Sequence, residues 1–367
     1  MDAELTVVGA GVIGAATALA LARRGASVVL LEAGPEPALG ASGTNSGILH
    51  TGFDSVPGEL ETDLILGSAA LRPPVLDAIG APILRCGAIV QASEELVANA
   101  RRNRVEVSLR EDGRLEVPGE AVTDPVAYTL GLVAAAERQR VDVRTGFRVG
   151  SLGRDGAGLV LESEGGERVR SRIVVNCAGL HADTVARLAG DDSFEVYPRK
   201  GEFLVFDPPQ GQTLEKILLP VPTRRTKGVL VFPAVDGKVI AGPTAVDQED
   251  KEDWSVRPEA RDEIFPKAVA MWPPLEGATP IAAYAGLRPA GRGVNYLIGR
   301  SRACDALINV AAIRSTGLTA SLGIAEHVCG LVEQAGASLG EESPLEEVEP
   351  VATGIPWWRR AAEGRAR

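Results

Sequence analysis

Residues 5–34 have the sequence LTVVGAGVIGAATALALARRGASVVLLEAG, and this stretch decides the fold. The apolar run Leu5 to Val8 is typical of a buried parallel strand. The next segment predicts a helix over Val12 to Arg24, with Gly25 as its C-terminal stop. Ser27 to Leu31 predicts a second buried strand that ends at Glu32. Strand, helix and strand in this order indicate a doubly wound α/β domain.

Three glycines at the turn into this helix form the G-x-G-x-x-G pattern of dinucleotide-binding units. The first allows a tight turn, the second lets a pyrophosphate approach the backbone, and the third lets helix and strand pack closely. The N-terminus of the helix then faces the phosphate charge. Glu32 stands where such units hold a ribose hydroxyl, which disfavours NADP. The residues that we expect at the nucleotide are Gly9, Gly11, Val12, Ile13, Gly14, Glu32 and Ala33.

The segment 40–47, GASGTNSG, follows shortly after Glu32, where a plain NAD-binding unit would continue with a helix and a strand. Small and hydroxyl-bearing residues suit close approach of the backbone to a bulky cofactor. From this segment we expect five residues to contact the cofactor: Ser42, Thr44, Asn45, Ser46 and Gly47.

At this point the chain resembles the FAD-dependent D-amino-acid-oxidase-like superfamily, in particular its glycerol-3-phosphate dehydrogenase/oxidase and L-2-hydroxyglutarate dehydrogenase branch. The resemblance is carried by motifs that follow the family's order: ASGTNSGILHTGFD at 41–54, NCAGLHADTVA at 176–186, KGVLVFPAVDGKVIAGPTA at 227–245, YAGLRPA at 284–290 and INVAAIRSTGLTASLGIAEHV at 308–328. It implies non-covalently bound FAD and an oxidoreductase. It also implies cofactor contacts at Val149, Ala178 and Gly179, and at Thr316, Gly317, Leu318 and Thr319, which open a helix.

Composition limits the other classes of function. The 367 residues carry a formal net charge of −11, which argues against a nucleic-acid partner because phosphate binding needs a basic face. The four cysteines are scattered and only three histidines are present, so we expect neither a disulfide framework nor a metal site. Without a signal peptide or a membrane-spanning run, we expect a cytoplasmic protein.

The pattern along the chain predicts two domains and a tail. The FAD-binding domain is expected to be discontinuous and Rossmann-like, assembled from 1–80, 141–194 and 301–340. Segments 81–140 and 195–300 are assigned to a mainly antiparallel substrate domain, because 195–300 contains hairpin signals such as Asp236-Gly237. Within the first domain, 58–81 has a helical pattern that Pro73 and Pro74 are expected to break.

The tail, 341–367, is expected to be mobile. Two tryptophans, Trp357 and Trp358, stand there beside two arginines. This pair suits either contact with a membrane surface or packing on the body of the protein. We therefore expect membrane association, if any, to be peripheral and to involve this tail.

Oxidation of an alcohol by a flavin needs a base for the hydroxyl proton and cations for an anionic substrate. His50 is the candidate base, since its unperturbed pKa lies near neutrality and the resembling family places its catalytic histidine in the same S-G-x-x-H-x-G motif. A histidine buried in the core is the alternative. Two other histidines are weaker candidates: we expect His181 to be a cap or a surface residue, and His327 to be structural.

Several arginine and lysine residues are candidates for binding the anionic group of the substrate. Arg288 lies in the G-L-R motif that reaches the substrate in the resembling family, and arginine binds carboxylate or phosphate through two parallel hydrogen bonds. Lys227 and Arg314 are further candidates for this anion, and the resemblance also places Arg288 near the cofactor. The case for Lys200 is weaker, and we expect the run Arg224-Arg225 to be solvated.

The favoured reaction is the FAD-dependent oxidation of glycerol 3-phosphate to dihydroxyacetone phosphate. The first alternative is a 2-hydroxy acid such as L-2-hydroxyglutarate, with the same base and the cations on carboxylates. The second is oxidation of an amino acid or amine, for which loss of His50 should matter little. The third is a flavin-holding subunit that passes electrons to a partner. The electron acceptor, quinone or oxygen, remains open at this stage.

Overall fold

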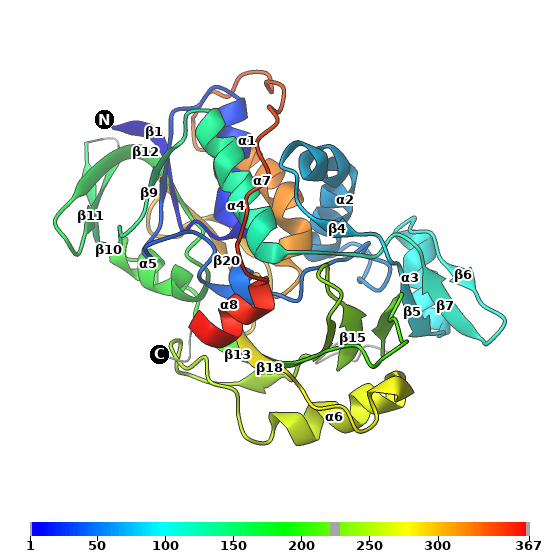
Figure 1. Ribbon diagram of the computed structural model, residues 1–367. Helices are drawn as coiled ribbons and strands as arrows, with labels where there is room; N and C mark the ends of the chain where they lie inside the picture. Colours follow the sequence, from blue (N-terminus) through cyan, green and yellow to red (C-terminus); the bar gives the residue numbers. More distant parts are fainter. Residues whose placement is uncertain (1, 157, 221–227, 365–367) are drawn as a thin grey trace.

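A mainly parallel sheet lies at the centre of one half of the molecule (Figure 1). In this sheet, β1 pairs in parallel with β2 and β12, β2 pairs with β9, and β12 pairs with β20. β10, β11 and the start of β12 extend it as an antiparallel meander, and β19 pairs antiparallel with β20. The strands are β1 Ala3–Val8, β2 Val28–Leu31, β9 Asp142–Arg144, β10 Val149–Asp155, β11 Gly158–Ser163, β12 Arg168–Asn176, β19 Leu297–Arg300 and β20 Leu307–Ala311. The computed structural model describes residues 2–156, 158–220 and 228–364.

Helices cover both faces of this first sheet. They are α1 Val12–Arg23, α2 Leu60–Ala78, α4 Pro125–Arg138, α5 Ala182–Leu188 and α7 Gly317–Gln334. α1 contacts both α4 and α7, and α2 packs against α7, so the four form one layer, while α5 packs on β10 and β20. α1 is rich in alanine and buried along most of its length, which lets its neighbours approach closely from two sides.

A second sheet, mainly antiparallel, forms the other half, in the order β17-β13-β16-β15-β14-β5-β7-β6 with β18 beside β13. Its longest pairing joins β13 to β18, with Arg199 opposite Arg288. α6 (Ala260–Met271) covers this sheet through Ile264 and Ala268. The strands are β5 Ala88–Gln91, β6 Ser108–Leu109, β7 Arg114–Val117, β13 Val196–Phe206, β14 Ile217–Leu219, β15 Leu230–Pro233, β16 Val239–Gly242, β17 Val246–Asp247 and β18 Ala282–Gly291.

Short elements join the two halves. A three-stranded sheet consists of β3 (Ile48–Leu49), β8 (Ala121–Thr123) and β4 (Ile83–Leu84). The remaining elements are α3 Glu94–Arg102, α8 Trp357–Gly364 and the 3-10 turns η1 Ala41–Thr44, η2 Gly179–His181 and η3 Pro273–Leu275.

The predicted fold class is confirmed: an α/β nucleotide-binding half assembled from separated segments and a mainly antiparallel second half. The segment 81–140 contributes to both halves. Its strands β5, β6 and β7 belong to the second sheet, whereas α4 packs on α1 in the first half.

The predicted break at Pro73 and Pro74 was wrong, because α2 runs without interruption from Leu60 to Ala78. A proline inside a helix removes a hydrogen bond and costs about 3 kcal/mol. Here the helix buries Leu64, Ile65 and Leu76 in the core that it shares with α7. We attribute the continuous helix to this burial, which outweighs the local cost.

The expectation of a mobile tail was wrong for Trp357–Gly364, which form α8, and of the two alternatives for the tryptophans the structure has the one in which they pack on the body of the protein. Trp357 is 0% exposed and Trp358 is 6% exposed. The Trp357 indole N–H donates to Asn45 O at 3.0 Å, and that of Trp358 donates to Asp236 Oδ2 at 2.8 Å. Upstream, Ser343 N donates to Arg23 O. The two rings gain more from burial against η1 and β18 than a solvated tail would.

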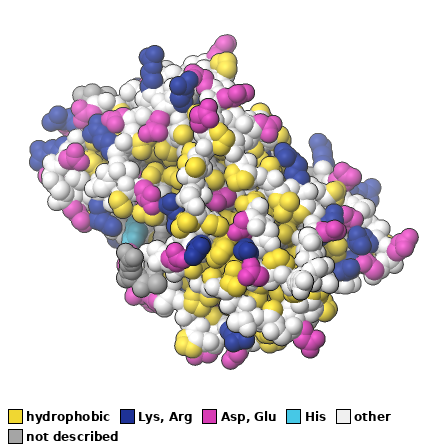
Figure 2. Space-filling model, in the orientation of Figure 1, with side chains coloured by type: hydrophobic (Ala, Val, Ile, Leu, Met, Phe, Trp, Pro, Cys, Tyr) yellow, Lys and Arg dark blue, Asp and Glu magenta, His cyan; other side chains and the backbone are white. Residues whose placement is uncertain are grey.

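The surface carries charged side chains of both signs (Figure 2). Figure 2 shows one face on which Lys and Arg side chains are interspersed with Asp and Glu. Among the described residues, no helix is both long enough and apolar enough to cross a bilayer.

Candidate active site

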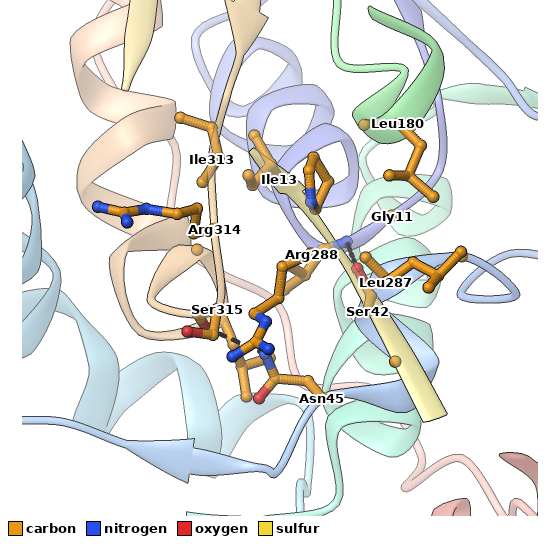
Figure 3. A pocket seen from close by; sticks show the side chains of 18 of the residues that line it. Gly11, Ile13, Ser42, Asn45, Leu180, Leu287, Arg288, Ile313, Arg314 and Ser315 are labelled. Carbon is orange, nitrogen blue, oxygen red and sulfur yellow. Dashed lines mark hydrogen bonds between the residues drawn. The ribbon is translucent and has the colours of Figure 1, made fainter. Parts of the chain in front are cut away.

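A cavity of about 680 Å³ lies between the two halves, at the carboxyl ends of β1, β2, β12 and β20. This edge of a parallel sheet is where doubly wound folds bind ligands. The predicted residues that line the cavity are Gly9, Gly11, Val12, Ile13, Glu32, Ala33, Ser42, Thr44, Asn45, Ser46, His50, Val149, Ala178, Gly179, Arg288, Arg314, Thr316, Gly317 and Leu318. Figure 3 shows several of them converging from both halves.

The turn between β1 and α1 needs its glycines. Gly9 has φ +101°, and a Cβ there would lie 2.5 Å from Cys177 O. A Cβ on Gly14 would lie 1.8 Å from Gly9 O, so the helix meets the turn only without a side chain. Gly14 therefore supports the turn from behind and does not line the cavity. The backbone at the start of α1 is left open toward the cavity, as a pyrophosphate requires.

Glu32 is fixed at the end of β2 by two backbone donors. Its Oε2 accepts from Ala10 N at 2.8 Å, and its Oε1 accepts from Gly34 N at 2.8 Å. The carboxylate thus stands at the cavity wall with lone pairs left over. This position suits acceptance of hydrogen bonds from ribose hydroxyls.

The loop 41–47 makes hydrogen bonds at the N-termini of both helices that face the cavity. Ser42 Oγ accepts from Val12 N at 2.9 Å and so caps α1, as Figure 3 shows. Asn45 Nδ2 donates to Ser315 O at 3.0 Å, just before α7. Gly47 has φ +78° and lies against Thr123 O, behind the cavity wall. The loop therefore connects the start of α1 with the start of α7.

His50 follows β3 and is held at three points. Its Nδ1 lies 2.8 Å from Glu120 Oε2, and its backbone N donates to Thr319 Oγ1 at 3.0 Å. Arg72 Nη2 donates to its carbonyl at 3.2 Å. His50 is buried and lines the cavity, whereas Thr319 lies behind it. The ring is therefore fixed with one nitrogen engaged by a carboxylate.

Sequence reasoning missed Glu120. Its Oε1 accepts from Thr51 N at 2.6 Å and from Thr51 Oγ1 at 2.9 Å, and its side chain is 0% exposed. Burial alone raises the pKa of Glu120, but the His50 ring and the Thr51 N–H hold that pKa below its ordinary value. Glu120 follows a Pro-Gly turn, seventy residues from His50, and no local pattern marks it.

Arg288 is a buried cation with backbone partners. Its Nε donates to Arg199 O at 3.0 Å, and its Nη2 donates to Lys200 O at 2.9 Å and Thr244 O at 2.7 Å. Desolvation, reinforced by nearby Arg199 and Arg314, lowers the pKa of Arg288 to about 10. Within the described ranges no carboxylate forms an ion pair with it. Arg288 is thus a buried positive charge at the cavity wall, opposed in part by the nearby carboxylate of Asp247, and an anion would be stabilised beside it.

Among the described residues, the predicted cations Arg314 and Lys200 direct their side chains to partners other than Arg288. Arg314 donates from Nε to Asn295 Oδ1 at 3.0 Å, and Figure 3 shows its guanidinium extending away from Arg288. Lys200 is buried in an ion pair with Asp253 at 2.7 Å. Lys227, Arg224 and Arg225 lie outside the described residues.

The two remaining histidines differ in position. His181 lines the cavity and its Nε2 lies 3.3 Å from Glu252 Oε1, while burial lowers its pKa. His327 is exposed on α7. No cluster of three or more His, Cys, Asp or Glu suited to a metal occurs in the part of the chain that the structure describes.

The cavity fits FAD. Two helix N-termini, those of α1 and α7, open on it, and both stabilise negative charge. Glu32 and the glycine turn supply a ribose acceptor and a close approach for the pyrophosphate. Cys177 beneath the turn is buried, which raises its pKa to about 12 and makes it inert.

Comparison with known proteins places these features in a family. The model of the family described as FAD dependent oxidoreductase (DAO) matches residues 4–331. The chain is 28% identical to the glycerol 3-phosphate oxidase of Mycoplasma pneumoniae over 90% of its length and 94% of that protein. It is 25% identical to the glycerol 3-phosphate dehydrogenase of Caloramator mitchellensis, over 96% of this chain and 78% of that one.

Other similarities lie in the same branch and in the fold. The mitochondrial L-2-hydroxyglutarate dehydrogenase of Mus musculus is 28% identical over 65% of this chain and 60% of its own length. The dithionite-reduced, FAD-bound L-α-glycerophosphate oxidase of Mycoplasma pneumoniae superposes with a TM-score of 0.87, at 24% identity, over 95% of this chain and 99% of that structure. With the cavity, the glycine turn and the family match together, the chain belongs to the DAO family of FAD-dependent oxidoreductases.

Proposed function

We propose that this enzyme oxidises the secondary alcohol of a small anionic substrate, and that the substrate is glycerol 3-phosphate, converted to dihydroxyacetone phosphate. The observation that carries the proposal is Arg288, a buried cation that lines the same cavity as His50 and has only backbone partners among the described residues. A base and an anion site in one cavity are what oxidation of a phosphorylated alcohol requires.

His50 accepts the hydroxyl proton of the substrate. Its Nδ1 is engaged by Glu120, so Nε2 is the nitrogen left for the substrate. Loss of this proton turns the C2 hydroxyl into a carbonyl as the C2 hydride leaves, and bound FAD supplies the hydride acceptor. The balance is two electrons and one proton to the cofactor and one proton to His50.

Arg288 holds the phosphate. Three of its five N–H donors are used by carbonyls of Arg199, Lys200 and Thr244, which leaves the two donors of Nη1. These two N–H groups diverge from one nitrogen, so each can donate a charge-assisted hydrogen bond to a separate oxygen atom of the substrate. Lys227 remains a candidate second cation, and Arg314, whose Nη2 lies 3.9 Å from Glu61 Oε2, lines the same cavity.

The residues that would hold FAD follow the cavity wall. The backbone at Gly9, Gly11 and Ile13 would hold the pyrophosphate, and Glu32 would accept a hydrogen bond from the adenosine ribose. The start of α7, at Thr316 to Leu318, lines the cavity and would stabilise negative charge on the flavin through the helix dipole.

Oxidation of a 2-hydroxy acid such as L-2-hydroxyglutarate is the second candidate, supported by the similarity to the mouse dehydrogenase. It uses the same base, with Arg288 on a carboxylate. Glycerol 3-phosphate is preferred because the glycerol 3-phosphate oxidase match extends over 90% of this chain, against 65% for the mouse protein.

Anaerobic bleaching of the bound flavin tests the proposal. Glycerol 3-phosphate, L-2-hydroxyglutarate, L-lactate and a mixture of amino acids are added to separate cuvettes of wild type and His50→Ala. The proposal predicts fast bleaching by glycerol 3-phosphate and a fall of about 10²-fold or more in the variant. Bleaching by a hydroxy acid alone moves the assignment to that substrate. Bleaching by amino acids that survives in the variant refutes it.

A control separates the remaining alternative. If FAD is bound and dithionite reduces it, but no alcohol or amino acid does, the chain is a flavin-holding electron-transfer subunit and the proposal fails. A His327→Ala variant, changed at an exposed histidine on α7, reports any effect of histidine substitution that is unrelated to the cavity.

A further inference from the structure

The buried contact between His50 and Glu120 carries an inference that rests on the proposed function and adds a residue to it. Glu120 is completely buried, and its two oxygens have different partners. Oε2 lies 2.8 Å from His50 Nδ1, while Oε1 accepts both the backbone N–H and the hydroxyl of Thr51. A carboxylate buried this deeply is stabilised only by such donors.

Thr51 fixes the orientation of the carboxylate. A backbone N–H is an obligatory donor, so the oxygen facing Thr51 N at 2.6 Å must be an acceptor. The carboxylate cannot rotate without breaking that bond. Oε2 is therefore presented to Nδ1 of His50 as an acceptor, and an ionised carboxylate has no proton to donate.

We propose that Glu120 is a positioning residue that holds His50 in the tautomer with its proton on Nδ1, which leaves the lone pair of Nε2 for the substrate hydroxyl. The neutral imidazole has one donor and one acceptor nitrogen, and the partner of one decides the role of the other. Glu120 touches neither substrate nor cofactor in this scheme and acts through His50.

Three other titratable groups in the described part of the chain act on this pair or on its neighbours. Arg72, from α2, donates to the carbonyl of His50. Asp54 lines the cavity and acts on Glu120 as a like charge, which opposes the lowering of the Glu120 pKa. Tyr128, from α4, faces Arg72. Among the described residues, the carboxylate of Glu120 is the acceptor that lies within hydrogen-bond distance of the His50 ring.

Glu120→Gln keeps the shape of the side chain at position 120 but changes which hydrogen bonds it can make to His50, so it tests the tautomer of His50 alone. The amide has one acceptor oxygen and one donor nitrogen, and Thr51 N–H needs the oxygen. The amide nitrogen then faces His50 Nδ1 and donates to it. The proton of His50 moves to Nε2, which can no longer accept the substrate proton.

The first test needs no substrate. The chain has three histidines, so nitrogen-15 histidine spectra contain few signals, and His181→Asn and His327→Asn identify the other two. In mildly alkaline buffer the proposal predicts that wild-type His50 carries its proton on Nδ1 and that Glu120→Gln moves it to Nε2. A wild-type His50 protonated on Nε2 overturns the proposal, whether or not any variant folds. An unchanged tautomer in Glu120→Gln overturns it as well.

The second test is kinetic. Anaerobic flavin reduction by glycerol 3-phosphate should fall by about 10²- to 10⁴-fold in Glu120→Gln, the range for loss of a general base. Substrate KM should stay within about twofold, because Arg288 is untouched. Glu120→Asp, which keeps an acceptor at this position, should recover part of the rate. Equal losses in the Asp and Gln variants, or a loss confined to KM, would contradict a role through the tautomer.

Failure of the inference and failure of the proposed function are distinguishable. If glycerol 3-phosphate does not reduce the wild-type flavin, the proposed substrate is wrong, and the tautomer spectra still decide the role of Glu120. Glu111→Gln, in an exposed turn before β7, is the matched control and should change neither the spectra nor the rate.

Discussion

The charge on Arg288 offers the sharpest test of the substrate's chemistry, through Arg288→Lys. Truncation to an apolar residue would leave three carbonyls, those of Arg199, Lys200 and Thr244, without their donor. Each such loss costs about 1–3 kcal/mol, so folding would fail for reasons unrelated to substrate. Lysine keeps the positive charge, but it has three donors on one nitrogen, too few for the carbonyls and a phosphate together.

The expected magnitude follows from the donors. Arginine has two donors left at Nη1, and lysine loses at least one bond to the anion. A hydrogen bond to a charged group contributes about 1.5–3 kcal/mol, which corresponds to about a tenfold to 150-fold weaker affinity. The loss should fall on substrate binding, because the hydrogen bonds of Arg288 go to the carbonyls of Arg199, Lys200 and Thr244, whereas His50 is held by Glu120.

Stopped-flow flavin reduction under anaerobic conditions measures this directly. The rate is followed against concentration for glycerol 3-phosphate and for glycerol, which lacks the phosphate. Arg288→Lys should raise KM for the phosphate ester and leave the slow reaction with glycerol unchanged, so the preference between the two shrinks. Arg300→Lys, at an exposed position on β19, is the control. An unchanged preference in Arg288→Lys would refute the phosphate-binding role.

Two further predictions concern stability. Trp357→Ala should lower the free energy of unfolding by about 3–5 kcal/mol and release FAD faster, because the ring is fully buried and its N–H donates to the carbonyl of Asn45 in the loop 41–47. Thermal melts with and without added FAD measure both effects. An unchanged melt would contradict the packing of the tail on the body of the protein. The Lys200 ammonium holds the pKa of Asp253 at about 2, below its ordinary 3.8. The stabilisation that this ion pair contributes is present above pH 3.8 and lost as the pH falls through about 2, so urea titrations should separate wild type from Asp253→Asn at neutral pH and converge below that value.

Local patterns predicted the nucleotide-binding half well. The helix predicted over Val12 to Arg24 is observed over Val12–Arg23, and Gly25 ends it with φ +82°. Such signals are local, because a tight turn, a helix stop or a buried strand depends on a few neighbouring residues. The rest of the fold was expected from the resemblance, whose motifs follow the order of the family.

Contacts between residues that are far apart in the sequence could not be predicted from it. Glu120 reaches His50 across seventy positions, and Trp357 reaches Asn45 from the far end of the chain. Neither contact leaves a periodic or spaced pattern. The direction in which a side chain points could not be predicted from the sequence either. The guanidinium of Arg314, for example, extends to Asn295 rather than toward Arg288 (Figure 3). Pro73 and Pro74 show the converse, a clear local signal that tertiary packing overrides.

In the proposed reaction, glycerol 3-phosphate reduces the flavin of this protein by one hydride. An anaerobic titration of the purified holoenzyme with glycerol 3-phosphate, with dihydroxyacetone phosphate measured in the same samples, tests it most directly. We expect full bleaching near one equivalent of substrate per flavin and one dihydroxyacetone phosphate formed per flavin reduced. A flavin that stays oxidised at excess glycerol 3-phosphate, yet is reduced by dithionite, would contradict it.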